Sequence, residues 1–262
     1  MRRLFFILFF ILGIVAAFCK ESRYAEIDFL FDKNMFDVSD IPLGIIPGQG
    51  LCAALGSKIV GLDVTRNDSF KEIALEDSTV VIDEFVITEK YMAFHSDNSI
   101  FWNTSNRGFD GIMFNDNLFS IALATDSTLF VIRKLDNEIF EIDLKSKSSL
   151  WSTRFDEPIV SVFRIGQDIV LVSSYKIALF VNGEWNILHN HPIEIVSSAI
   201  TPYGIFFGTS DALWRIHGVD EIQYIARGAI SHILFDRDIL YIVDNESNVY
   251  TIPFKVIDSE VN

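Results

Sequence analysis

The fold is decided by residues 118–151, which read LFSIALATDSTLFVIRKLDNEIFEIDLKSKSSLW. Apolar runs at 118–124 and 129–132 are separated by a short polar turn, and a second polar turn leads into the alternating segment 139–143. A fourth short segment closes the stretch at Leu150-Trp151. Short apolar or alternating segments joined by tight polar turns are typical of antiparallel strands. The stretch therefore predicts one four-stranded antiparallel meander.

The same pattern recurs along the chain with a period close to 40 residues. Each unit has an apolar strand, a polar turn and then a strand that opens on a large apolar residue, here called the anchor. The six anchors are Ile59, Ile100, Ile139, Ile177, Leu213 and Val249. They are separated by 41, 39, 38, 36 and 36 residues. Four strands per unit at this period predict an all-β protein, a β-propeller of six four-stranded blades.

The last unit shows only three clear strands, so its fourth strand must come from elsewhere. The N-terminal segment Ile27–Phe31 alternates as a strand does, and we expect it to complete the last blade, closing the ring by pairing the N- and C-terminal strands. Closure is favourable because it removes exposed sheet edges. One alternative is seven blades, with a degenerate extra unit in 24–58. Another is a β-sandwich or jelly roll, which does not explain six anchors in step.

The N-terminus has the features of a secretory signal peptide. Two arginines precede an uncharged apolar run, Leu4–Phe18, and small residues stand at the expected positions before a cleavage site at Ala17. We expect residues 1–17 to be the signal peptide and 18–262 to be a single secreted propeller domain, with cleavage after Cys19 as an alternative. The other interpretation is an uncleaved anchor, although a spanning helix needs ~20 apolar residues.

The chain is strongly acidic, with 21 Lys and Arg against 36 Asp and Glu and a net charge of −15. Nucleic acids and anionic membranes bind positive surfaces, so we expect neither as a partner once the signal peptide is removed. The acidic surface fits an extracellular monomer and would suit a cationic ligand. The sequence leaves a small-molecule ligand or a protein partner open, and it identifies no cofactor.

The chain has two cysteines, Cys19 and Cys52. If cleavage follows Ala17, both enter an oxidising compartment and can form a disulfide between the new N-terminus and the first repeat. If cleavage follows Cys19 instead, Cys52 is a single thiol in the core.

Three N-x-S/T sequons make Asn67, Asn103 and Asn245 candidate glycosylation sites. All three fall at predicted turns or strand ends, where an acceptor asparagine is accessible. Glycosylation at these positions would require a eukaryotic secretory pathway.

Two other motifs are explained by turns. Gly48–Ala53 matches the G-x-G-x-x-A dinucleotide fingerprint, but the chain leaves no room for the crossover helix that the motif requires. His189 and His191 have the spacing of two metal ligands on one strand face. Pro192 follows them, so we interpret the pair as solvated loop histidines.

The polar residues on or just after the first strand of each unit are the candidate binding residues. The first strand of a propeller blade lines the central channel, so such residues are the ones placed to contact a ligand there. They are Asp83, Asp126, Arg164, His232 and Asp236. The alternative interpretation is that they are turn residues or water-solvated groups.

Two family resemblances are visible. Asn137–Asp143, followed by Leu150-Trp151, resembles the repeat of quinoprotein-type propellers in this unit alone. The segments DIPLGI (Asp40–Ile45), GIFFGTSDALWRI (Gly204–Ile216) and ISHILFDRDILYIVDNESNVYTI (Ile230–Ile252) are similar to insect ommochrome-binding proteins. This second resemblance implies carriage of a tryptophan-derived pigment rather than catalysis.

We therefore expect a secreted binding protein that carries a small aromatic ligand, such as an ommochrome-like pigment, in the channel or on one face. One alternative is a protein-interaction scaffold of the secretory pathway. The other is a metal-dependent propeller hydrolase or lactonase, for which the chain offers only Asp83, Asp126 and Asp236 as channel carboxylates. No catalytic residue and no metal ligand is assigned.

Overall fold

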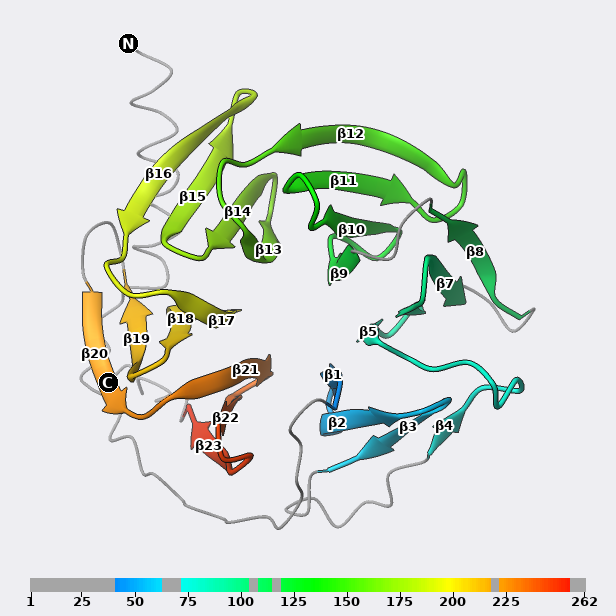
Figure 1. Ribbon diagram of the computed structural model, residues 1–262, viewed down its shortest axis with the longest axis horizontal. Coiled ribbons are helices and arrows are strands. Elements are labelled where there is room, and N and C mark those ends of the chain that lie inside the picture. The colour runs from blue at the N-terminus through cyan, green and yellow to red at the C-terminus, as the bar shows by residue number, and fades with distance from the viewer. Residues whose placement is uncertain (1–40, 63–71, 104–107, 115–118, 218–221, 255–262) are drawn as a thin grey trace, which may run out of the picture.

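The structure, a computed structural model, describes residues 41–62, 72–103, 108–114, 119–217 and 222–254. These residues form 23 strands in six antiparallel sheets, which are arranged around a common centre (Figure 1). The chain is thus an all-β, six-bladed propeller, as the repeat predicts. Residues 43–61 belong to the first of the six blades and supply no seventh.

The first three blades run in chain order. Blade 1 contains β1 (Leu43–Ile46), β2 (Gly50–Leu55), β3 (Lys58–Gly61) and β4 (Ile73–Ala74). Blade 2 contains β5 (Glu84–Ile87), β6 (Met92–Ser96), β7 (Ser99–Asn103) and β8 (Asp110–Met113). Blade 3 contains β9 (Phe119–Leu123), β10 (Thr128–Arg133), β11 (Glu138–Asp143) and β12 (Ser148–Arg154).

The last three blades complete the ring. Blade 4 contains β13 (Ile159–Ile165), β14 (Asp168–Ser173), β15 (Lys176–Val181) and β16 (Glu184–Asn190). Blade 5 contains β17 (Ile195–Thr201), β18 (Gly204–Thr209), β19 (Ala212–Ile216) and β20 (Ile222–Arg227). Blade 6 contains β21 (Ile230–Asp236), β22 (Ile239–Asp244) and β23 (Val249–Pro253).

Blade 6 has three strands within the described ranges, and β23 has no neighbour on its outer side there. Residues 27–31, which the sequence predicts as the fourth strand, lie outside the described residues, as do Cys19 and Asn67. Pairing of the two chain ends therefore stays a prediction.

The strand register confirms the alignment of the repeats. Each anchor lies in the third strand of its blade, opposite a residue of the second strand, and all six anchors are buried. The second strands are buried on both faces along most of their length, which explains why they read as continuous apolar runs.

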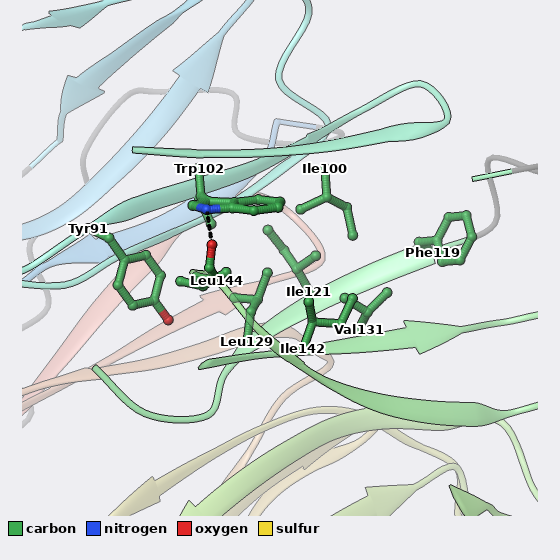
Figure 2. Packing of buried hydrophobic residues seen from close by; sticks show 10 residues of the cluster. Tyr91, Ile100, Trp102, Phe119, Ile121, Leu129, Val131, Ile142 and Leu144 are labelled. Atoms are coloured by element: carbon green, nitrogen blue, oxygen red, sulfur yellow. Dashed lines mark hydrogen bonds between the residues drawn. The ribbon is translucent and has the colours of Figure 1, made fainter. Parts of the chain in front are cut away.

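The core consists of contacts between adjacent blades, and Figure 2 shows the cluster between blades 2 and 3. Trp102 of β7 is 1% exposed, and its Nε1–H donates a hydrogen bond of 3.0 Å to the carbonyl of Leu144, which follows β11 (Figure 2). Tyr91 donates through its hydroxyl to the carbonyl of Thr128, 3.1 Å away. These two aromatic side chains therefore join neighbouring blades by packing and by hydrogen bonds. Within the part of the chain described, no helix is long and apolar enough to cross a membrane.

Candidate binding cavity

A cavity of about 760 Å³ opens on the face of the propeller where the inner strands begin. Its lining residues come from blades 1, 2, 3 and 6. Asp83, Glu84, Asp97, Lys134 and His232 contribute charged or titratable side chains to it. Ligand pockets typically measure 300–1,000 Å³ and contain a few converging polar groups. The cavity is thus of a size and polarity suited to ligand binding.

One position of the repeat recurs at this end of every inner strand. In blade 2, Glu84 lies opposite His95, and His95 lies opposite the anchor Ile100. The residues in the same register position of the six blades are Pro42, Glu84, Ser120, Ser161, Ser197 and His232. Three are serines and one is a carboxylate, and four of the six line the cavity. We call this set the register ring.

Members of the register ring join neighbouring blades at three junctions, between blades 2 and 3, 4 and 5, and 5 and 6. Glu84 accepts the backbone N–H of Ile121 at 2.7 Å, and Ser197 accepts that of Ile233 at 2.9 Å. Ser161 and Ser198 share a hydrogen bond between their hydroxyls. An inner strand has no sheet neighbour on its channel side, so these acceptors satisfy backbone groups that would otherwise be unpaired. The primary role of the register ring is therefore structural, because its hydrogen bonds hold neighbouring blades together.

Glu84 differs from the serines of the ring because it can carry charge. Burial raises the pKa of its carboxyl to about 7, although the Ile121 N–H and the charge of Lys134 act in the opposite direction. Near neutral pH the carboxyl is therefore divided between its two protonation states. A carboxylate with so strongly raised a pKa, beside a cavity, is a candidate functional group.

Asp83 and Asp97 place exposed carboxylates at the mouth of the cavity. Asp83 accepts the backbone N–H of Asp97 at 2.8 Å, which holds the turn between β6 and β7. Asp97 adopts a left-handed backbone with φ of 53°, a conformation that aspartate tolerates better than most residues. Neither carboxylate forms an ion pair within the described ranges.

His232 lies across the cavity from blade 2, near the start of β21. Burial lowers the pKa of its imidazole below the usual value, so the ring is neutral at pH 7. Its Nδ1 lies 3.2 Å from the Ser231 hydroxyl. A neutral imidazole can both donate and accept, which adds a polar contact without adding positive charge.

The structure brings two of the five candidate binding residues, Asp83 and His232, to this cavity. The other three lie toward the opposite face, where the inner strands end, and each has a partner there. Asp126 is exposed and forms an ion pair with Lys90. Asp236 is buried and accepts the backbone N–H of Gly48.

Arg164, the third of these, takes part in a polar cluster between blades 3 and 4. Its guanidinium pairs with Glu141, and it lies 5.4 Å from the ring centroid of Phe130. Glu141 also accepts hydrogen bonds from Trp151 and, at 2.8 Å, from Thr128. The charge of Arg164 is thus compensated inside the blade interface.

The candidate disulfide and glycosylation positions lie partly inside and partly outside the described residues. Cys52 is fully buried, its thiol donates to the carbonyl of Gly44 at 3.3 Å, and burial raises its pKa to about 12. Pairing with Cys19 stays a prediction. Asn245 is exposed in the turn after β22, and Asn103 is half-buried at the end of β7, so both sequons stay predictions.

The strand–turn interpretation of Gly48–Ala53 agrees with the structure, because β2 begins at Gly50. Among the residues that the structure describes, no group of three or more His, Cys, Asp or Glu side chains is placed to hold a metal ion.

The comparisons with known proteins concern the fold. No family model and no curated protein matches the sequence. The β-propeller domain of Cps50 (Swd1) from Myceliophteria thermophila has 11% identity and a TM-score of 0.53, over 78% of this chain and 80% of that one. BBS1N in complex with ARL6DN has 12% identity and a TM-score of 0.56, over 79% and 75%. A chain of the mitotic checkpoint complex has 11% identity and a TM-score of 0.57, over 79% and 74%. At these identities the similarities show the fold of the chain, a β-propeller, and nothing beyond the fold.

Proposed function

We propose that the protein is a secreted binding propeller without enzymatic activity, and that it docks a protein partner on the face where the inner strands begin. A basic side chain of the partner enters the cavity described above. The observation that carries this proposal is the pair of exposed carboxylates at the cavity mouth, Asp83 and Asp97, which lack a cationic partner in the described chain.

Charge supports this choice of partner. The net charge of −15 attracts a basic surface, and such attraction raises association rates. Inside the cavity, Glu84 adds a third carboxyl whose charge a bound cation would favour. BBS1N in complex with ARL6DN and the mitotic checkpoint complex, whose structures are similar to this fold, are protein assemblies, and they supply the analogy for a protein partner.

Selection from a random peptide library tests the proposal without knowledge of the partner. The probe is the full chain as secreted, and the comparison is its Asp83→Asn/Asp97→Asn double variant. We expect peptides selected by the wild type to be enriched in Arg and Lys and to bind the double variant at least about tenfold more weakly, a loss of ~1.4 kcal/mol. Added salt should weaken the wild-type binding.

Asp126→Asn is the matched control, because it removes one exposed carboxylate from the opposite face. Selected peptides should bind this variant as they bind the wild type. Peptides without an excess of basic residues, or peptides that bind the double variant unchanged, would contradict the proposal.

Carriage of a small aromatic ligand, such as an ommochrome-like pigment, is the second candidate. The favouring observation is that Leu43, Val81 and Phe119 provide apolar surface inside a cavity of ligand size. A carrier should co-purify from its native source with an absorbing compound. Val81→Arg, which changes an exposed lining residue, should then reduce the bound pigment. Among the described residues, no group of three or more His, Cys, Asp or Glu side chains supports the metal-dependent hydrolase.

A further inference from the structure

Two imidazoles meet at the outer edge of the junction between blades 4 and 5, away from the cavity. His189 lies near the end of β16, and His191 follows that strand. The register of β15 and β16 shifts so that Ile177 lies opposite His189 while Ala178 lies opposite Ile187. The extra residue, Leu188, forms a bulge, and bulges change the direction in which the following side chains point.

The interpretation of these residues as solvated loop histidines is wrong for His191, which is 7% exposed. Its ring centroid lies 5.0 Å from that of Phe207 and 5.1 Å from that of Trp214. Both aromatic residues belong to blade 5. The sequence could not show this burial, because it depends on how blade 5 packs against the end of β16.

The two rings also contact each other, with Nε2 of His189 lying 3.3 Å from Nδ1 of His191. This is the one hydrogen bond of the His191 ring in the described chain, and its Nε2 is buried without a partner there. No competing polar group among these residues therefore holds the ring in another orientation.

We propose that His189 and His191 form a bidentate zinc site at the junction of blades 4 and 5. A tetrahedral zinc ion binds imidazole nitrogens at about 2.0–2.1 Å, which places two such nitrogens about 3.3–3.4 Å apart. The Nε2–Nδ1 separation of 3.3 Å matches this spacing. A square-planar metal with similar bonds would require about 2.9 Å, so the geometry favours zinc.

The described residues supply no third side-chain ligand. The two remaining tetrahedral positions are therefore open to water or to a donor atom of an incoming molecule. The exposed carboxylate of Asp211 adds a negative charge near the pair without acting as a ligand.

Calorimetric titration of the full secreted chain with a zinc salt tests the site. We expect one equivalent of zinc to bind. His189→Ala and His191→Ala should each weaken binding by at least about tenfold, a loss already typical when only an outer-shell partner is removed. His217→Ala is the control, because the His217 ring contacts Arg215 and the Tyr203 carbonyl instead, and it should bind zinc as the wild type does.

Trp214 provides a second measurement. Zinc binding at the pair should change the indole fluorescence of Trp214, because that ring lies beside His191. Trp214→Phe should lose this change while retaining the zinc isotherm. If His191→Ala fails to fold, the half-buried His189→Ala decides the outcome. A wild type that binds no zinc, or a folded His189→Ala variant with wild-type affinity, overturns the proposal.

Discussion

Asp236 and Gly48 stand 188 residues apart in the chain, yet the Asp236 carboxylate accepts the Gly48 backbone N–H with both oxygens, at 3.1 and 3.2 Å. Asp236 ends β21 of the last blade, and Gly48 lies in the turn between the first two strands of blade 1. Gly48 has a φ of +75°, and a Cβ there would lie 2.1 Å from the guanidinium of Arg237. The first and last blades are thus joined at a turn whose left-handed backbone favours glycine.

Replacing Asp236 by Ala should destabilise the protein by about 2 kcal/mol, the typical value of a hydrogen bond to a charged group. Urea denaturation measures the loss of stability, and hydrogen exchange should increase in β1 and β21, which flank the junction between blades 1 and 6. Asp126→Ala removes an exposed carboxylate instead and should cost less than about 1 kcal/mol. Equal costs for the two variants would show that Asp236 does not join the blades.

Because β23 has no neighbour on its outer side among the described residues, we predict that the N-terminal segment pairs with it. If residues 27–31 supply the fourth strand of blade 6, Ile27→Asp/Phe29→Asp should place two charges on one face of that strand. The melting temperature should fall by several degrees, since ~1 kcal/mol corresponds to about 2–4 °C at this size. Light scattering should rise, because an open edge promotes association. Asp28→Asn, on the other face, is the control, and an unchanged melting temperature in the double variant would contradict closure by this segment.

The repeat could be predicted from the sequence because the signals that define it are local. An apolar second strand, a polar turn and an anchor such as Ile100 or Ile139 occur within about 15 residues of one another, and strand pairing then follows from the turn. The register ring is harder to predict from the sequence. Recognising Glu84 as the counterpart of Ser120 and Ser197 requires the pairing partners of three successive strands.

The channel residues were predicted less completely, for a physical reason. The first strand of a blade has two ends, and its polar residues reach opposite faces of the ring. Asp83 and His232 lie near strand starts, whereas Arg164 and Asp236 lie near strand ends. The partners of Arg164 and Asp236, which are Glu141 and Gly48, belong to other blades. Only the closed ring therefore shows which polar groups are already hydrogen-bonded or ion-paired.

Trp102 tests how much a buried hydrogen bond between blades contributes to the free energy of unfolding. Trp102→Phe removes the donor of the hydrogen bond to Leu144 and leaves that carbonyl buried without its partner. An unsatisfied buried group costs about 1–3 kcal/mol, and the volume lost adds to this, so we expect about 3 kcal/mol by urea denaturation. Trp185→Phe is the control, because the Trp185 indole donates to the carbonyl of Arg154 at the surface. The loss of stability in this variant should be smaller. A comparable loss in both variants would argue against the contribution of burial.

Glu84 makes stability depend on pH in the opposite direction from most carboxylates. Its pKa rises from 4.5 to about 7 on folding, so between these values the folded state binds more protons than the unfolded state. Stability from this group is therefore fully present below pH 4.5 and is lost as pH rises through about 7, by about 3 kcal/mol at most. Glu84→Gln keeps an acceptor for the Ile121 N–H but cannot ionise.

Denaturation of wild type and Glu84→Gln at several pH values separates this effect from other titrations. The variant should gain stability relative to the wild type as pH rises from 5 to 8, because it avoids burying a charge. Asp83→Asn, which changes an exposed neighbour, should show no such trend. Binding of a cationic peptide should change in the opposite sense, increasing with pH as Glu84 becomes charged. A stability difference between wild type and Glu84→Gln that is constant over this range would show that Glu84 does not titrate there, and it would remove Glu84 from the proposed cation-binding cavity.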